Sequence, residues 1–416
     1  MNALLTRAVR FFWSRFFLLV VCLAAWTEWL CATWVLVDLT DLRPGPVAHA
    51  VAFLALLAIN LDVRRRPVTT TARSRRLRRI YTAAALTSLF GAALLLVNTV
   101  VWTGVWTLVS LVPSPTPWIT TDTLVSLAAR SGTVGLGVVA ATIVYGYTLG
   151  ARQLRIRDLD VTLRGLPGAF DGLRVAQISD VHLGPYMDAA EVAAYVDRVN
   201  ELAPDLVVIT GDITDGLWHA HETFPALGGL RARFGVVAIL GNHDVYTGAD
   251  DVVAALREHT DFVVLVDEAH TIDDAGARLH VVGLSDLGLD WARGVREHPA
   301  LPGLAATIDD DEPAILLSHR PDLFGQAVAH GFDLVLSGHT HGGQIALPWF
   351  GERAPSMAHF MTRFPRGTFR DGSSTLHVNL GLGVTALPVR VFTPREVTLI
   401  TLNEAQGEQP RCNESV

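Results

Sequence analysis

The sequence predicts a helical membrane region followed by an α/β domain. Hydrophobic residues make up 50% of the 416 residues, and the long apolar stretches are concentrated in the first 150. From residue 173 onward, short apolar runs alternate with amphipathic segments, as strands alternate with helices in α/β proteins. Short polar motifs follow several of these runs. A chain of this length has room for two or three domains.

Four apolar stretches form the first region, at residues 16–37, 47–61, 80–101 and 131–149. The first, third and fourth approach the ~20 residues that a helix needs to span a bilayer. The second is shorter, so a re-entrant segment is an alternative for it. We predict a four-helix transmembrane domain over residues 1–150, a linker over 151–158, a second domain over 159–404 and a flexible tail over 405–416.

Arginine positions predict how this region is oriented. Arginines precede the first stretch, eight lie between the second and third, and three follow the fourth, whereas the opposite loops hold only Arg43 and Arg130. The positive-inside bias therefore predicts a multi-pass cell-membrane protein whose second domain faces the cytoplasm. Glu28 lies inside the first stretch, where acids are often functional. Packing against a neighbouring helix is the alternative for Glu28.

Charge and cysteine content exclude several classes of function. Residues 1–157 hold 16 arginines and 5 acids, a balance of +11, whereas the remainder holds 17 arginines and 36 acids, a balance of −19. Such an acidic half is a poor match for a phosphate backbone, so no nucleic-acid partner is expected. Only three cysteines are present, at positions 22, 31 and 412. Neither a disulfide framework nor a cysteine zinc site is therefore predicted.

The second domain shows a regular succession of elements. Asp188 is a predicted N-cap, with Glu191 three residues later as its capping-box partner. The run 206–209 is apolar throughout, as in strands covered on both faces. Helices are predicted at 188–202, 222–233, 250–259 and 321–330, and strands at 173–178, 206–210, 236–240, 262–266, 278–282, 314–317, 334–336, 375–380 and 397–402.

Five polar motifs follow the apolar runs at the points where open α/β sheets place their sites. Each motif brings carboxylate, amide or imidazole groups, and each alone is a weak signal. Together they supply enough oxygen and nitrogen ligands for two metal ions. In order they are Asp180-Val181-His182, Gly211-Asp212, Gly241-Asn242-His243-Asp244, Ser318-His319 and Gly338-His339-Thr340-His341.

The residue types of these motifs indicate which ions they would take. Aspartate, asparagine and histidine without cysteine favour manganese, iron or zinc. A carboxylate can bridge two ions, and two ions about 3.5–4 Å apart can lower the pKa of a water and clamp an in-line displacement at phosphorus. The motifs therefore predict a dinuclear metal centre and a phosphoester substrate.

The same motifs make the chain resemble the calcineurin-like metallophosphoesterase superfamily, and in particular its YkuE-like branch. The segments 178–184 and 336–344 look typical of that branch, and the resemblance covers residues 159–402. It implies a two-sheet αββα sandwich of the metallo-dependent phosphatase type. It also implies a hydrolase in which a metal-bridging hydroxide attacks a phosphodiester or phosphomonoester, without a covalent enzyme intermediate.

The resemblance further implies a role for each motif residue. Asp180, His182 and His341 would hold the first metal, and Asp212 would bridge. His243 would protonate the leaving oxygen, and Asp244 would orient the His243 imidazole. The second metal would be held by Asn242, His319 and His339.

Other residues receive weaker predictions. Gln344 and Arg390 are candidate substrate contacts, and Asp215 is expected to support the Asp212 loop. The aromatic and arginine-rich segment 345–369 is either a packed loop or a rim that faces the substrate or the membrane. The remaining histidines are expected to be bystanders; the pair His219 and His221 is an example.

The membrane region adds a hypothesis about the substrate, which can be a phospholipid or another lipid-linked phosphoester. The alternatives within the superfamily are a nuclease and a nucleotide phosphodiesterase. An alternative from another class is a membrane sensor or transporter whose cytoplasmic domain binds metal without turnover. That alternative predicts a broken ligand set or strongly charged spans, whereas the ligand set is intact and the spans are nearly free of charge.

Overall fold

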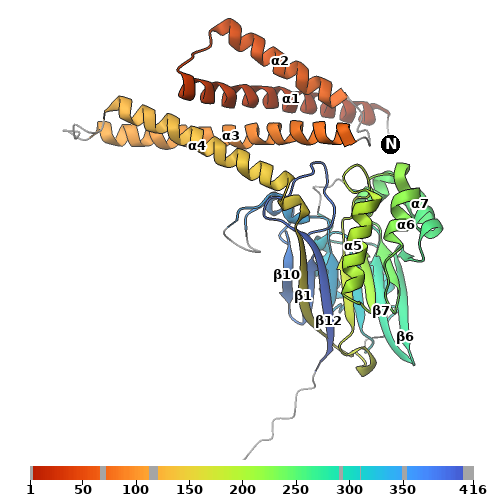
Figure 1. Cartoon of the computed structure of the whole chain (residues 1–416). Helices are drawn as coiled ribbons and strands as arrows, with labels where there is room; N and C mark the ends of the chain where they lie inside the picture. The colour runs from red at the N-terminus through yellow and green to blue at the C-terminus, as the bar shows by residue number, and fades with distance from the viewer. Residues whose placement is uncertain are drawn as a thin grey trace, which may run out of the picture. The chain divides into compact units, whose positions relative to one another are not determined.

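The computed structural model describes residues 3–65, 72–111, 120–289, 294–309, 311–348 and 354–405. It divides into two compact units, Met1–Tyr147 and Thr148–Val416 (Figure 1). The boundary between the units therefore falls close to the predicted end of the membrane domain at residue 150.

The first unit consists of four helices, α1 (Ala3–Thr40), α2 (Pro46–Arg65), α3 (Ala72–Ser110) and α4 (Thr121–Tyr147). Three segments are long and apolar enough to cross a membrane: Leu19–Thr40, Arg76–Ser110 and Thr121–Arg152. The apolar part of α2, Pro46–Asp62, is shorter. These helices fit the predicted N-terminal membrane region.

Polar side chains link the helices of this unit. The amide of Asn60 in α2 donates to the Glu28 carboxylate of α1 over 2.9 Å. The Tyr81 hydroxyl of α3 donates to the same amide group. Glu28 therefore contacts a neighbouring helix, as the packing alternative for this residue expects. Hydrogen bonding reduces the cost of holding a polar group in an apolar environment.

The second unit contains two six-stranded sheets. The first sheet has the order β1-β12-β2-β3-β4-β5, and the second has the order β10-β11-β9-β8-β7-β6. The strands of the first are β1 (Leu154–Leu163), β12 (Arg395–Glu404), β2 (Arg174–Ile178), β3 (Leu206–Thr210), β4 (Val236–Ile239) and β5 (Val263–Leu265). Those of the second are β10 (Gly367–Asp371), β11 (Ser374–Val378), β9 (Leu334–Ser337), β8 (Ala314–Ser318), β7 (Ala277–Leu284) and β6 (Glu268–Asp274).

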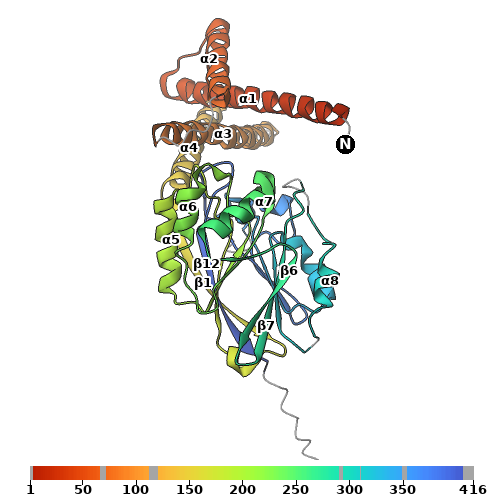
Figure 2. The same ribbon diagram turned by 90° about the vertical axis from the view of Figure 1, so that its right-hand side faces the viewer.

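Helices cover the outer faces of the two sheets, as Figure 2 shows for the second unit. The outer layers are α5 (Ala189–Glu201), α6 (Ala220–Leu227) and α7 (Asn242–His259) on one side, and α8 (Leu301–Ala305) and α9 (Phe324–Ala329) on the other. Three apolar cores result, one between the sheets and one under each helical layer. The resulting αββα sandwich confirms the predicted fold class.

Short 3-10 helices complete the second unit. The first of them precedes β1, and the others lie in the connections between later elements. They include η1 (Gly150–Arg152), η2 (Gly168–Phe170), η3 (Leu217–His219), η4 (Pro321–Leu323), η5 (His341–Gly343) and η7 (Met357–Phe360).

The central strands lie where the sequence predicts them, but three strands were not predicted. These are β1, β6 and β10, and each lies at an edge of its sheet. Edge strands face solvent and carry charged residues, so their apolar pattern is weak. The structure also corrects the predicted linker 151–158, because η1 and the first half of β1 occupy it. β1 pairs in parallel with β12 from Leu154 onward.

Candidate metal centre

The five polar motifs meet in one place because each follows the carboxyl end of a strand. Asp180 and His182 follow β2, Asp212 follows β3, and the Asn242 motif follows β4. The remaining two motifs come from the second sheet, after β8 and β9. Both sheets therefore contribute side chains, which lie at the carboxyl ends of neighbouring parallel strands, as expected.

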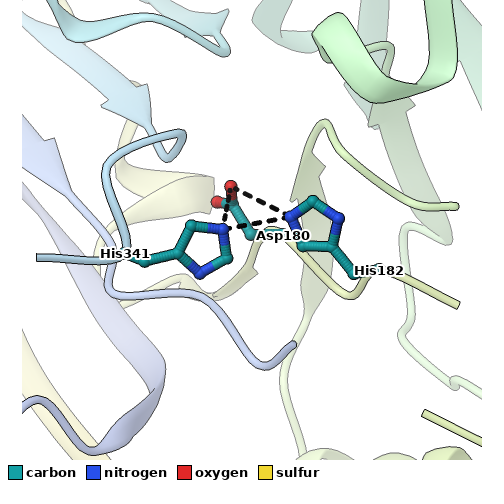
Figure 3. Close-up of side chains that lie close together, drawn as sticks. All are labelled: Asp180, His182 and His341. Atoms are coloured by element: carbon teal, nitrogen blue, oxygen red, sulfur yellow. Dashed lines mark hydrogen bonds and ion pairs between the residues drawn. The ribbon is translucent and has the colours of Figure 1, made fainter. Parts of the chain in front are cut away.

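Asp180, His182 and His341 form the first cluster (Figure 3). The Nε2 atoms of the two histidines lie 3.0 Å apart. Asp180 Oδ1 lies 3.3 Å from His341 Nε2 and 4.0 Å from His182 Nε2. Figure 3 shows all three groups pointing toward one another. All three side chains are buried, so one cation could contact them together.

Asp212, His319 and His339 form the second cluster. His319 Nε2 lies 3.2 Å from Asp212 Oδ2 and 3.2 Å from His339 Nδ1. Asp212 Oδ2 also lies 3.6 Å from Nε2 of His182, which belongs to the first cluster. Asp212 is thus placed between the two groups of side chains.

The backbone at this site is strained. Five of the predicted ligands, Asp180, His182, Asp212, His339 and His341, have positive φ angles between 49° and 71°. Residues other than glycine rarely adopt this left-handed conformation, and each instance costs of the order of 1 kcal/mol. Such strain persists only where the surrounding structure enforces it. At this site it turns successive side chains toward one point.

Two glycines allow the strand ends to approach the acidic side chains. A Cβ atom on Gly241 would lie 2.2 Å from Asp212 Oδ1. A Cβ atom on Gly338 would lie 2.2 Å from Asp180 Oδ2 and 1.9 Å from the Ser179 hydroxyl. No side chain fits at either position, which explains why these motifs contain glycine before asparagine or histidine.

The protonation pattern of two histidines suits a cation. The Nδ1 atom of His182 donates to the Asp215 carboxylate over 2.7 Å, because a carboxylate can only accept. The Nδ1 atom of His319 donates to the Thr210 carbonyl over 2.8 Å. Each Nε2 atom therefore presents a lone pair in the neutral ring, the arrangement that fixes histidine as a metal ligand.

The pKa values of these rings show that the site attracts positive charge. Burial lowers the pKa of His182, but the carboxylates led by Asp215 outweigh burial and raise it to about 9. Burial likewise opposes protonation of His319, yet Asp212 raises the pKa of that ring to about 10. Burial also acts on Asp212, but His319 and His182 hold the pKa of its carboxyl well below the usual range. A bound cation would take the place of the protons on the two rings and balance the charge of the carboxylates.

Asn242 provides a further test of the fit to a metal. Its side chain is 1% exposed, and neither its oxygen nor its nitrogen has a hydrogen-bond partner of good geometry in the described part of the chain. A buried amide without partners is costly. Asn242 directly follows Gly241, the glycine that lies against Asp212. The donor set, all oxygen and nitrogen, fits divalent cations.

His243 is partly exposed to solvent. Its ring packs edge-on against His182 at 4.7 Å between centroids, and its side chain is 28% exposed. Its Nδ1 atom contacts Asp215 Oδ1 at 2.8 Å. His243 could also join Asp212 and His182 around an ion, because the three ligand atoms lie within 4.8 Å.

The structure corrects the role expected for Asp244. Its buried carboxylate accepts hydrogen bonds from the backbone N–H groups of Gly241, Ile213 and Thr214. Asp244 therefore caps α7 and ties the β3 and β4 loops together, and it does not orient the His243 ring. Asp215 orients that ring, a role that sequence reasoning missed. The spacing Gly-Asp-x-x-Asp was the available signal.

In this structure the side chains of the two candidate substrate contacts form hydrogen bonds with the backbone of nearby loops. Arg390 is fully buried, and its guanidinium donates to carbonyls that include those of Leu380 and Gly381. Both polar atoms of the Gln344 amide pair with the backbone of Thr385. Neither group is therefore available to a phosphate, and both predicted substrate contacts are corrected to structural roles.

The segment 345–369 combines packed and exposed residues. Phe364 is buried, whereas Phe360 is 86% exposed. Trp349, Phe350 and Arg353 lie outside the described residues. The side chain of His219 also lies outside them, and exposed His221 lies 3.6 Å from Glu222.

Comparison with known proteins identifies the family. Residues 173–343 match the calcineurin-like phosphoesterase family. The metallophosphoesterase YkuE of Bacillus subtilis is 34% identical over 283 residues, which cover 66% of this chain and 96% of that protein. A relative from Danio rerio, named "transmembrane protein with metallophosphoesterase domain", is 31% identical over 68% of this chain and 65% of its own length. A Campylobacter jejuni metallophosphoesterase is 31% identical over 65% of this chain and 69% of its length.

The fold, the clustered aspartates and histidines, and these relatives agree. Members of this family are phosphoric ester hydrolases that use divalent metal ions, and the clustered side chains are candidates to hold them. The chain belongs to the calcineurin-like metallophosphoesterase family.

Proposed function

We propose that the protein is a membrane-anchored phosphoesterase with two metal ions in one centre. The observation that carries this proposal is the position of Asp212. It belongs to the cluster with His319 and His339, and it also lies within 3.6 Å of His182 in the other cluster. A single carboxylate can thus serve two ions.

The proposed assignment follows the two clusters. Asp180, His182 and His341 would hold the first ion, and Asp212 would bridge. The second ion would be held by His319 and His339 together with Asn242, whose amide has no hydrogen-bond partner of good geometry in the described residues. Manganese, iron and zinc all suit this donor set.

The protein groups around the ions suggest how the reaction proceeds. Bound ions would supply Lewis acidity and lower the pKa of a water in the site. His243 would donate a proton from its ring to the leaving oxygen. Asp215 would hold the ring in place through its Nδ1 atom. The burial of Asp180, Asp212 and His341 would keep bulk water from the ligand atoms.

The membrane unit leads to a proposal about location and substrate. Three apolar helices and the arginine distribution support a multi-pass protein with a cytoplasmic catalytic unit. A substrate in or near the bilayer, such as a phospholipid or a lipid-linked phosphoester, would suit an enzyme fixed there.

The test is a metal-reconstituted assay of the full-length protein in nanodiscs. Bis-aryl phosphate, mono-aryl phosphate and phospholipid would be compared after loading with manganese, zinc or iron. Asp212→Asn serves as the blank, and Asp197→Asn, an exposed acid of α5, serves as the matched control. We expect metal-dependent turnover that Asp212→Asn abolishes. Equal activity of Asp212→Asn and the unmodified protein would refute the dinuclear centre.

A further inference from the structure

The second unit contains a cavity, lined in part by arginines, that includes none of the proposed metal ligands. It has a volume of about 250 Å³ and lies between the start of β1 and the loops before β10 and β12. Arg155, Arg157 and Arg366 contribute charge to its lining, and Leu347 and Phe392 contribute apolar surface. The proposed reaction makes no use of it.

Basic residues outnumber acidic ones in the lining of this cavity. Glu396 is the one acidic residue among its lining residues, against three arginines. Glu396 is buried, and its carboxylate lies 3.5 Å from His377 Nε2. Burial raises the pKa of Glu396, but His377 and then Arg157 and Arg155 outweigh burial and lower it. Glu396 therefore stays ionised, so the residues that line the cavity include three arginines and one carboxylate.

The cavity also has an apolar rim. Leu347 is 49% exposed and Phe392 is 40% exposed. Phe392 has a φ of 56°, a left-handed conformation that is rare for a bulky residue. Its neighbours hold this conformation, because Val391 forms a bridge with Ile345 and the Thr393 hydroxyl donates to the Gln344 carbonyl. The loop thus holds an aromatic ring at the surface beside the arginines.

The position of the arginines in the chain, shortly after the last apolar helix, indicates that a ligand of this cavity would be an anionic lipid. Arg155 follows the last residue of α4, Tyr147, by eight residues. Arg152, Arg155 and Arg157 are the basic residues that follow the last apolar helix. Basic residues next to a membrane span attract anionic lipids. Arginine binds phosphate through its planar fork of donors.

We propose that this cavity binds the phosphate group of an anionic phospholipid, with Leu347 and Phe392 against the adjoining part of its acyl chains. The two arginines of β1 contact the phosphate, and the buried guanidinium of Arg366 adds positive charge behind them. Arg366 is held in place because it donates to the Ala354 carbonyl over 2.6 Å. The site would bind lipid without hydrolysing it, so it does not depend on the reaction at the metal centre.

The test uses the full-length protein in neutral detergent and measures lipid binding by native mass spectrometry. Phosphatidylglycerol and phosphatidylcholine with identical acyl chains are titrated, and inorganic phosphate and glycerophosphoglycerol are added as competitors. The test variant is Arg155→Gln with Arg157→Gln. The matched control is Arg231→Gln with Arg257→Gln, two exposed arginines elsewhere on the same unit.

We expect the unmodified protein and the control to prefer phosphatidylglycerol, and the test variant to lose at least fivefold in affinity for that lipid alone. Leu347→Ser should weaken lipid binding but leave competition by glycerophosphoglycerol unchanged. An unchanged test variant overturns the proposal. Inorganic phosphate that binds as tightly as the lipid overturns the lipid assignment. If the double variant fails to fold, the single change Arg155→Gln at an exposed position replaces it, with an expected loss of at least twofold.

Discussion

One carboxylate oxygen of Asp215 contacts the Nδ1 atoms of both His182 and His243, at 2.7 and 2.8 Å. His182 is a proposed metal ligand, and His243 is the proposed proton donor. A single acid therefore orients two imidazoles with different tasks. Burial raises the pKa of Asp215, but the two histidines, His182 first, outweigh burial and hold it far below its usual range. Asp215 thus stays ionised in the metal-free protein.

Replacing Asp215 by asparagine should affect both histidines. We expect the affinity for metal to fall about 10–100-fold, the usual effect of losing an outer hydrogen-bond partner of a ligand. Turnover at saturating metal should fall as well, because His243 loses its orientation. Metal titration and steady-state kinetics would measure the two effects, with Asp197→Asn as the control. If metal affinity fell but turnover at saturating metal were unchanged, the result would contradict the proposal that Asp215 orients His243.

Replacing His243 by alanine should slow substrates with poor leaving groups most. A general acid contributes about 10²–10⁴-fold, and an aryl oxide leaves with little help from a proton donor. We therefore expect a much larger fall in kcat for an alkyl phosphate ester than for a nitrophenyl ester. Equal losses on both esters would instead favour His243 as a metal ligand, which its distance to Asp212 and His182 allows.

Metal binding should release protons at neutral pH. The pKa values of about 9 for His182 and about 10 for His319 mean that both rings are protonated in the metal-free protein at pH 7. A cation must displace these protons, so its apparent affinity should rise as the pH rises toward 9. Calorimetry in buffers with different ionisation enthalpies would count the protons. Binding that is independent of pH between 6 and 9 would contradict this expectation.

Replacing Gly241 by alanine should disrupt the centre, because the new methyl group would lie 2.2 Å from Asp212 Oδ1. We expect a destabilisation of about 1–3 kcal/mol, typical of overpacking in a filled site, together with weakened metal binding. Gly303→Ala is the matched control, since its added methyl group would have no atom within 4 Å in the described structure apart from its chain neighbours and the backbone of its own helix. Thermal unfolding with and without metal would compare the two variants.

Replacing Arg390 by methionine should unfold the loops rather than weaken substrate binding. The loss of a fully buried guanidinium leaves several carbonyls without donors, at a cost of about 1–3 kcal/mol or more. A fall in melting temperature with unchanged KM in the remaining folded protein is expected. An increased KM with unchanged stability would instead favour Arg390 as a substrate contact.

The fold could be predicted where the strands are buried on both faces. The run 206–209 is apolar at every position, and β3 is buried at every position. Because such strands need continuous apolar sequence, their ends are visible in the sequence, and so are the motifs that follow them. The edge strand β1 instead alternates arginines and aspartates with apolar residues, and its first half was predicted to be a linker.

The sequence by itself determined the apolar helices, the buried strands and the identity of the polar groups at the strand ends, because each depends on local composition. The tertiary structure decided which aspartate contacts the His243 imidazole and which one accepts hydrogen bonds from the backbone. Asp244 is adjacent to His243 in the chain, yet it is the distant Asp215 that contacts the imidazole, while Asp244 accepts from backbone N–H groups. The left-handed backbone at Asp212 and at four other predicted ligands is likewise visible only in the folded structure.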